Sequence, residues 1–298
     1  MKGFGSCALA LAMVSLTLAG QATAETQASQ EAQATQGPAV VSFDWGSVDT
    51  LEALGLEAHV VGLPYQAAPT YMQHLLEGRT DVGSLKTPDA EAVASAEPQL
   101  ILVTGRQEEA AVPLGEIAEV VDVTLEKGPF FAAFGDKVRG LAKRYNAETQ
   151  AEAALAELSA HIEKARASLP EALSVVVVTH NDGNYSLRQE PVVGELLQLA
   201  PPPLPEGVVS VQRGERTFTP LPPEVMERMA PDAVLVVDRS AAIGEAPLEA
   251  SALQEALADQ GGAAIEVVSL SADLWYLSGA GLVSIREQVD EVVEALTH

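Results

Sequence analysis

The sequence predicts an α/β protein of two similar, Rossmann-like lobes that are joined by a single long, rigid helix. A pattern of charged, proline and apolar residues occurs twice, 133 residues apart, and one long helical segment lies between the two copies. The apolar runs LILVTG and AVLVVD are continuous instead of alternating. Continuous runs are typical of strands in parallel sheets that helices cover on both faces.

The first residues have the pattern of an export signal. Lys2 supplies a positive charge, residues 8–19 form an apolar run, and Ala22-Thr23-Ala24 is typical of a cleavage site. The apolar run is shorter than the roughly 20 residues that a membrane-spanning helix needs. We therefore expect residues 1–24 to be a cleaved signal peptide and the mature protein to lie outside the cytoplasm.

The composition limits the classes of function. Residues 25–37 are rich in Gln, Ala and Thr without a periodic apolar face, which indicates a flexible leader. Cys7 is the only cysteine and lies within the predicted signal peptide, so the mature chain is expected to have no disulfide, thiol chemistry or cysteine-ligated metal. The formal net charge of −25 disfavours nucleic acid and anionic lipid as partners. Any anionic ligand would therefore need a local basic pocket.

The repeated pattern defines the centre of each lobe. EAVASAEPQLILVTGR runs from Glu91 to Arg106, and EVMERMAPDAVLVVDR runs from Glu224 to Arg239. In both copies a glutamate opens a short helical pattern, a proline ends it, and an apolar run of strand type leads to an arginine. We expect each copy to fold as a short helix followed by a buried strand.

One long helix is expected between the two copies. Residues 146–169 contain neither Gly nor Pro, and their apolar residues recur at helical spacing. At about 1.5 Å per residue such a helix spans roughly 35 Å, enough to run the height of a domain. It separates an N-terminal lobe of residues 38–145 from a C-terminal lobe of residues 170–298, and it permits only limited hinge motion.

The ends of the strands predict a ligand cleft between the lobes. Ligands of open α/β sheets bind beyond the carboxyl ends of the strands, where Arg106 and Arg239 follow, one in each lobe. Each could instead be a surface arginine that pairs with nearby acids, but matched positions in a repeat favour a shared cleft. AVVSFDWG and SVVVVTH open the two lobes, which predicts that Trp45 and His180 lie near this cleft.

Sequence signals for catalysis and for a bound metal are missing. The chain has no P-loop, dinucleotide-binding, nucleophile-elbow or zinc-protease motif. The histidines show no metal-ligand spacing and lie at positions 59, 74, 161, 180 and 298. We therefore expect a binding protein that is not an enzyme and has no intrinsic cofactor.

Four motifs add a resemblance to a known family. SFDWGSVDTLEALG, EPQLILVTGR, APDAVLVVDR and WYLSGAGL follow one another along the chain. In this order they resemble the substrate-binding proteins of ABC importers for ferric siderophores, especially the branch that carries iron–catecholate complexes. The resemblance extends from about Val40 to Leu296. It implies the class III binding-protein fold, a periplasmic monomer, a ferric siderophore as ligand and an inner-membrane ABC permease as partner; haem or a cobalamin-like corrinoid is the alternative ligand.

The resemblance also implies roles for individual residues. Arg106 and Arg239 match two arginines that neutralise anionic catecholates in that branch, and Arg188, in YSLRQEPVVGELL, is the nearest candidate for a third. Tyr276 matches a tyrosine that can coordinate Fe(III). Trp45 would supply further aromatic surface to the ligand.

One position departs from the pattern of the family. Some members pair this tyrosine with a histidine about 22 residues before the second-lobe arginine. Here Thr217 stands at that distance from Arg239, which makes it a candidate ligand-binding residue. Three interpretations stay open: the ligand is hexadentate and needs no protein donor, His180 replaces the missing histidine, or the ligand differs.

Two glutamates complete the implied roles. Glu91 and Glu224 match acidic residues by which related proteins dock onto basic pockets of the membrane permease, one from each lobe. Their identical place in the repeat favours paired use, although both would also be ordinary solvated helix residues.

Overall fold

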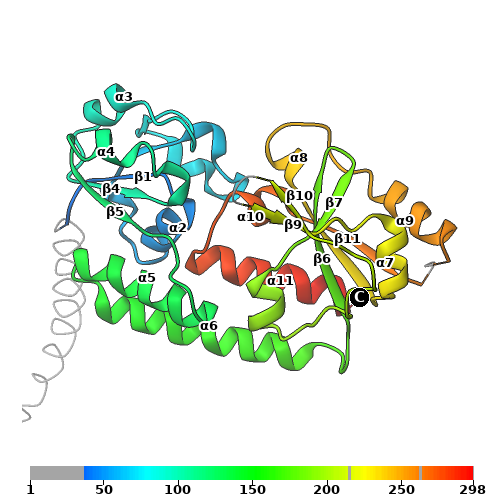
Figure 1. Ribbon diagram of the computed structural model, residues 1–298. Coiled ribbons are helices and arrows are strands. Elements are labelled where there is room, and N and C mark those ends of the chain that lie inside the picture. The colour runs from blue at the N-terminus through cyan, green and yellow to red at the C-terminus, as the bar shows by residue number, and fades with distance from the viewer. Residues whose placement is uncertain (1–36, 214–215, 262–263, 298) are drawn as a thin grey trace, which may run out of the picture.

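The computed structural model describes residues 37–213, 216–261 and 264–297 (Figure 1). The predicted signal peptide, residues 1–24, and residues 25–36 of the predicted leader lie outside this part of the chain. Within the described residues, no helix combines the length and the hydropathy that crossing a membrane requires.

The first half of the chain forms a parallel sheet of five strands in the order β3-β2-β1-β4-β5. Its strands are β1 Val40–Ser42, β2 Val60–Leu63, β3 Thr80–Asp81, β4 Leu100–Val103 and β5 Glu119–Asp122. Its α-helices are α2 Trp45–Ala53, α3 Ala90–Ser95, α4 Ala111–Leu114 and α5 Phe130–Arg144. Short 3₁₀ helices cover Glu57–His59, Tyr65–Ala67, Thr70–Leu76 and Gly105–Gln107.

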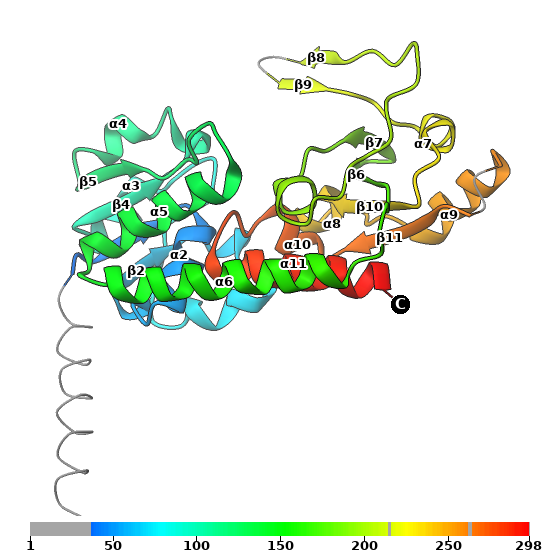
Figure 2. The same ribbon diagram turned by 90° about the horizontal axis from the view of Figure 1, so that it is seen from below.

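The second half forms a four-stranded sheet in the order β11-β10-β6-β7, in which only β7 is antiparallel to its neighbour. Its strands are β6 Val175–Asn181, β7 Asn184–Leu187, β10 Ala233–Asp238 and β11 Glu266–Leu270. Its helices are the short segment Val192–Leu196, α7 Pro223–Met229, α8 Arg239–Ala242, α9 Ala250–Asp259 and α10 Ala272–Tyr276. A separate ribbon of β8 Val211–Arg213 and β9 Arg216–Phe218 projects from this lobe (Figure 2).

The continuous apolar runs occupy the central strands, as predicted. In β4, Leu100 and Leu102 pack into one hydrophobic core, whereas Ile101 and Val103 pack into another on the opposite face of the sheet. The residues of β10 alternate in the same way between two cores. Because both faces of each strand are covered, the residues that face the two cores are apolar.

The two copies of the repeat have the same local structure. In the first, α3 leads into β4, and in the second, α7 leads into β10. Both strands are fully buried, and Arg106 and Arg239 follow directly at or near their carboxyl ends. The prediction of a helix, a buried strand and a terminal arginine in each lobe is confirmed.

Two helices, rather than one, run from lobe to lobe. Helix α6, Glu148–Ser168, connects the sheets as predicted, and the last helix, α11 Leu282–Thr297, lies alongside it (Figures 1 and 2). The amino end of α11 packs on α2 of the first lobe. One hydrophobic core contains residues of α2, α5, α6 and α11 together with the strands of both sheets. The contribution of α11 to the connection is not apparent from the sequence.

Candidate functional site

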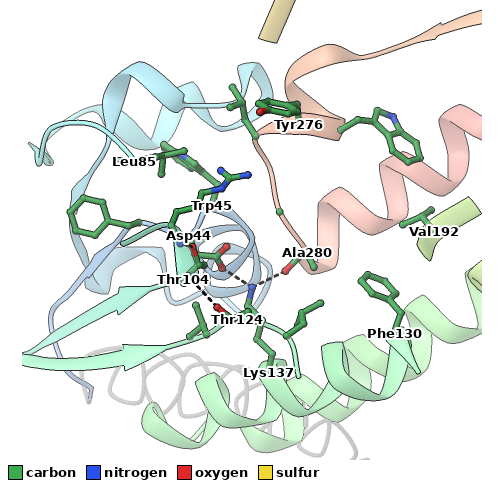
Figure 3. Close-up of a pocket in the computed structure, with 18 of the residues that line it drawn as sticks. Asp44, Trp45, Leu85, Thr104, Thr124, Phe130, Lys137, Val192, Tyr276 and Ala280 are labelled. Carbon is green, nitrogen blue, oxygen red and sulfur yellow. Dashed lines mark hydrogen bonds and ion pairs between the residues drawn. The ribbon is translucent and has the colours of Figure 1, made fainter. Parts of the chain in front are cut away.

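A cavity of about 460 Å³ opens between the lobes, beyond the carboxyl ends of the central strands (Figure 3). The first lobe lines it with segments that follow β1, β4 and β5 and with helix α5, and the second with the segment after β7, with α10 and with the start of α11. Its polar and aromatic lining residues include Asp44, Trp45, Thr104, Arg106, Thr124, Phe130, Lys137, Arg188, Glu190, Trp275, Tyr276 and Gln288.

A buried ion pair lies at the floor of the cavity. Lys137 Nζ is 2.6 Å from Asp44 Oδ2, and the side chains are only 6% and 11% exposed. Lys137 also donates to the carbonyl oxygen of Ala280, which precedes α11 (Figure 3). Asp44 in addition caps helix α2 by accepting a hydrogen bond from the backbone N–H of Ser47 at 2.8 Å. The pair therefore joins three elements, and removal of one partner would leave a buried, uncompensated charge.

Trp45 lies in the wall of the cavity, as predicted from its place after the first strand. Its side chain is almost completely buried, and its indole Nε1 has no hydrogen-bond partner within the described residues. A buried N–H without a partner is costly unless a ligand or water accepts from it. The indole therefore belongs mainly to the hydrophobic core of the first lobe, and only its small exposed part borders the cavity.

Arg106 lies at the mouth of the cavity with an exposed side chain. Its backbone is fixed by a capping box of Thr104 and Gln107, and the N–H of Gly105 donates to Thr124 Oγ1 at 3.0 Å. Among the described residues, the guanidinium has neither an ion-pair partner nor a hydrogen-bond acceptor. A fixed backbone that carries an unpaired guanidinium suits recognition of an anion.

Arg188, the candidate for a third arginine, also lines the cavity. Its Nε is 2.7 Å from Glu190 Oε2, and its Nη2 donates to the carbonyl oxygen of Trp275 at 3.1 Å. Burial raises the pKa of Glu190, while Arg188 and the backbone N–H of Val192 oppose that rise. Arg188 is therefore already paired with an acid that itself faces the cavity.

Arg239 lies next to the cavity, behind Tyr276. Its Nε donates to the hydroxyl of Tyr276 at 3.0 Å, and its guanidinium carbon is 5.8 Å from the centre of that ring. A second guanidinium nitrogen donates to Asn181 Oδ1. Tyr276 itself belongs to helix α10 and lines the cavity. Arg239 and Tyr276 are therefore in contact, but Tyr276 lines the cavity and Arg239 does not.

The prediction that His180 lies near the same cleft as Trp45 is wrong. Strand β6 extends to Asn181 and turns directly into β7, so His180 stays within the sheet, beside Asp238 on β10. Its Nδ1 is 2.7 Å from Asp238 Oδ1, and its Nε2 accepts a hydrogen bond from the N–H of Gly183 at 3.1 Å. Both ring nitrogens are used, so His180 has no lone pair left for iron.

Thr217 and the two glutamates lie on the surface of the protein. Thr217, a predicted ligand-binding residue, does not line the cavity, because its segment forms the exposed β8–β9 ribbon. Glu91 and Glu224 are exposed in the first turns of α3 and α7, one on each lobe. The described residues contain no group of three or more His, Cys, Asp or Glu side chains that could hold a metal ion.

Sequence reasoning missed three charged residues of the site. Asp44, Lys137 and Glu190 all line the cavity, but none belongs to the repeat. The available signal was weak: Glu190 lies two residues after Arg188, and Lys137 is an ordinary helix residue in the sequence. Their pairing depends on the tertiary fold.

Two α/β lobes, a cavity between them and a paired-helix connection define a two-lobed solute-binding protein. The chain belongs to the periplasmic binding protein family, whose profile matches residues 40–264. The prediction of family and fold class is confirmed.

Relatives with known ligands support the family assignment. The chain is 29% identical over 270 residues to the petrobactin-binding protein YclQ of Bacillus subtilis, which covers 86% of this chain and 82% of YclQ. It is 23% identical over 267 residues to the ferric-anguibactin-binding protein FatB of Vibrio anguillarum, covering 86% of this chain and 81% of FatB.

Two solved structures have the same fold as this chain over most of its length. The crystal structure of YclQ matches with a TM-score of 0.75 and 28% identity, over 88% of this chain and 93% of YclQ. The iron-uptake ABC transporter substrate-binding protein PiuA of Streptococcus pneumoniae matches with a TM-score of 0.74 and 26% identity, over 88% of this chain and 94% of PiuA.

Proposed function

We propose that this protein captures a ferric siderophore, of catecholate type, and delivers it to an ABC importer. The observation that carries the proposal is the cavity between the lobes, where Arg106, Trp45 and Tyr276 face one space. A ferric catecholate is both anionic and aromatic, so it complements these groups in charge and in surface. The relatives YclQ and FatB, which are named for ferric or siderophore ligands, support the same class of ligand.

Each lining residue has a defined part in holding such a ligand. Arg106 donates charge-assisted hydrogen bonds to catecholate oxygens at the mouth of the cavity. Tyr276 and the part of Trp45 that lines the cavity pack against the aromatic rings of the ligand. Arg188 contributes a second positive charge, which Glu190 partly neutralises.

Tyr276 is the candidate for a direct bond to iron. Its hydroxyl is oriented by Arg239, and a phenolate oxygen is a hard donor suited to Fe(III). A tetradentate bis-catecholate leaves coordination sites on iron for this oxygen, whereas a hexadentate complex does not. We expect Tyr276→Phe to shift the visible charge-transfer band of a bound ferric bis-catecholate and to leave that of a tris-catecholate unchanged.

The remaining parts of the proposal concern location and partner. The sequence pattern of residues 1–24 supports export through a cleaved signal peptide into the periplasm, where the protein acts as a monomer. The exposed Glu91 and Glu224 are the candidate contacts to the inner-membrane permease. The protein binds without catalysis, so ligand released after incubation should be chemically unchanged.

Titration with ferric complexes tests the proposed function. Ferric bis-catecholate and ferric tris-catecholate are added separately to the purified protein while tryptophan fluorescence is followed. We expect quenching at micromolar ligand, and a smaller response in Trp45→Phe because Trp45 lines the cavity. Lack of quenching by every ferric complex would contradict the proposal. A Soret band that appears with haem and shifts in Tyr276→Phe would instead indicate a haem carrier.

A further inference from the structure

The cavity carries less positive charge than its arginines suggest. Its charged lining residues are three cations and two carboxylates, namely Arg106, Lys137, Arg188, Asp44 and Glu190. Lys137 is paired with Asp44, and Arg188 is paired with Glu190, at 2.6 and 2.7 Å. Within the described part of the chain, Arg106 is the one lining cation without an acidic partner.

Neither pair can easily release its cation to a ligand. Lys137 is almost completely buried and is also bound to the carbonyl oxygen of Ala280. The Glu190 side chain is only 10% exposed, and Arg188 Nε is 2.7 Å from its Oε2. If a ligand took Arg188 away, Glu190 would remain as a buried carboxylate next to an anion, which is strongly unfavourable.

Ligand charge should therefore matter at this site. Three doubly deprotonated catecholates around Fe(III) form a trianion, and a cavity with one unpaired cation leaves most of that charge uncompensated. Uncompensated charge in a partly desolvated site is costly. A complex with fewer negative charges avoids this cost and can still pack on Trp45 and Tyr276.

We propose that Glu190 is a specificity-determining residue that, by occupying Arg188, makes the cavity select ferric complexes of low negative charge over trianionic ones. The proposal rests on the proposed function, because it concerns the ligand class of the same site. The second pair, Lys137 with Asp44, adds to the selection by holding another cation at the floor of the cavity.

The test uses two probes of the same shape and different charge. A tris-catecholate ligand forms a trianion with Fe(III) and a dianion of the same shape with Ti(IV). Dissociation constants for both are measured by tryptophan fluorescence with the wild-type protein, Glu190→Gln and Glu171→Gln. Glu171 is an exposed residue between α6 and β6, so its variant removes one charge far from the cavity.

We expect the wild-type protein to bind the Ti(IV) complex at least about threefold more tightly than the Fe(III) complex. In Glu190→Gln, affinity for the Fe(III) trianion should rise about tenfold and the preference for the dianion should disappear. Glu171→Gln should behave as the wild type. Glutamine has nearly the shape of glutamate and still offers an acceptor to Arg188. Thermal unfolding checks that the variant folds.

The outcomes separate the two proposals. Equal or tighter binding of the trianion by the wild-type protein would overturn the role of Glu190 and leave siderophore binding intact, and this comparison needs no variant. The role of Glu190 would also be overturned if Glu190→Gln kept the preference of the wild-type protein for the Ti(IV) dianion over the Fe(III) trianion. If the wild-type protein bound neither of these complexes nor the ferric bis-catecholate, the proposed function itself would fail.

Discussion

Asp49 Oδ2 accepts a hydrogen bond from the backbone N–H of Ser284 at 2.7 Å, so a side chain of the first lobe caps the last helix of the chain. Its Oδ1 accepts from the N–H of Val283, also at 2.7 Å, and the hydroxyl of Tyr71 donates to Oδ2 at 2.9 Å. The carboxylate is completely buried. Burial raises the pKa of Asp49, and the hydrogen bonds from Val283, Ser284 and Tyr71 oppose this rise.

Replacement of Asp49 by alanine should destabilise the whole protein. The change leaves two buried N–H groups and one hydroxyl without acceptors and removes the cap of α11, so we expect a loss of about 2–4 kcal/mol in the free energy of unfolding. Urea denaturation followed by circular dichroism measures this loss. Asp136→Ala, an exposed carboxylate, should change stability by less than about 0.5 kcal/mol. Equal effects of the two substitutions would contradict the role of Asp49.

Gly281→Ala tests the close contact between α2 and the segment before α11. An added Cβ would lie 2.3 Å from Cγ of Asp49, so the helices must separate, at a cost of about 1–3 kcal/mol. Gly140 in α5 is exposed with open space around it, and Gly140→Ala should stabilise by about 0.5–1 kcal/mol. Thermal unfolding of the two variants should therefore shift in opposite directions, and a shift in the same direction would argue against the contact.

Arg106→Ala should weaken binding of a ferric catecholate about tenfold or more, because it removes charge-assisted hydrogen bonds to the ligand. Its stability should stay near that of the wild-type protein, since the guanidinium has no partner among the described residues. Arg228→Ala serves as the control: Arg228 is exposed on α7, and its one acceptor among the described residues is the carbonyl oxygen of Glu206. If both variants bound the ligand equally well, Arg106 would have no specific part in the site.

Asp238 is expected to make the stability of the folded protein depend on pH at acidic pH. Burial raises the pKa of Asp238, but hydrogen bonds from the N–H groups of Leu248 and Ala241 and from His180 outweigh it, so the pKa is lowered from the ordinary 3.8. Because the pKa of Asp238 is lower in the folded state, its ionised carboxylate stabilises the protein above about pH 3.8. That contribution is lost as the pH falls through the folded-state pKa. We expect the unfolding temperature to fall in this range for the wild-type protein and to change less steeply in Asp238→Asn. Parallel curves would show that other carboxylates dominate.

The double variant Glu91→Gln with Glu224→Gln tests docking to the permease. Both residues are exposed, so ligand affinity should be unchanged, while stimulation of the importer's ATPase activity in proteoliposomes should fall about tenfold. The control is Glu171→Gln with Glu206→Gln, which makes the same change in net charge at other exposed positions. Equal loss in both double variants would indicate a general charge effect instead of docking.

The sequence was sufficient to predict the lobes, because the signals were local. Continuous apolar runs mark the buried strands, and the absence of Gly and Pro marks α6. The role of α11 was not predictable, since its amphipathic pattern does not reveal that Asp49, more than 230 residues earlier, caps it. Contacts over that distance depend on how the lobes pack.

The site was only partly predictable, because charge pairing is a tertiary property. The strand-end rule placed Arg106 at the cavity and placed Arg239 beside it. The rule failed for His180, because a tight turn follows β6 where a helix follows β1. Glu190 and Lys137 carry no sequence signal that separates them from ordinary surface charges, and the structure alone reveals their partners.

The paired connection of α6 and α11 has a consequence for how a bound ligand leaves. Two packed helices and a buried carboxylate cap join the lobes, so we expect only a small opening motion between them. Ligand binding should then cost little conformational entropy, because the two lobes are already held in place. If the proposed permease receives the ligand, we expect it to act on both lobes at once to release it.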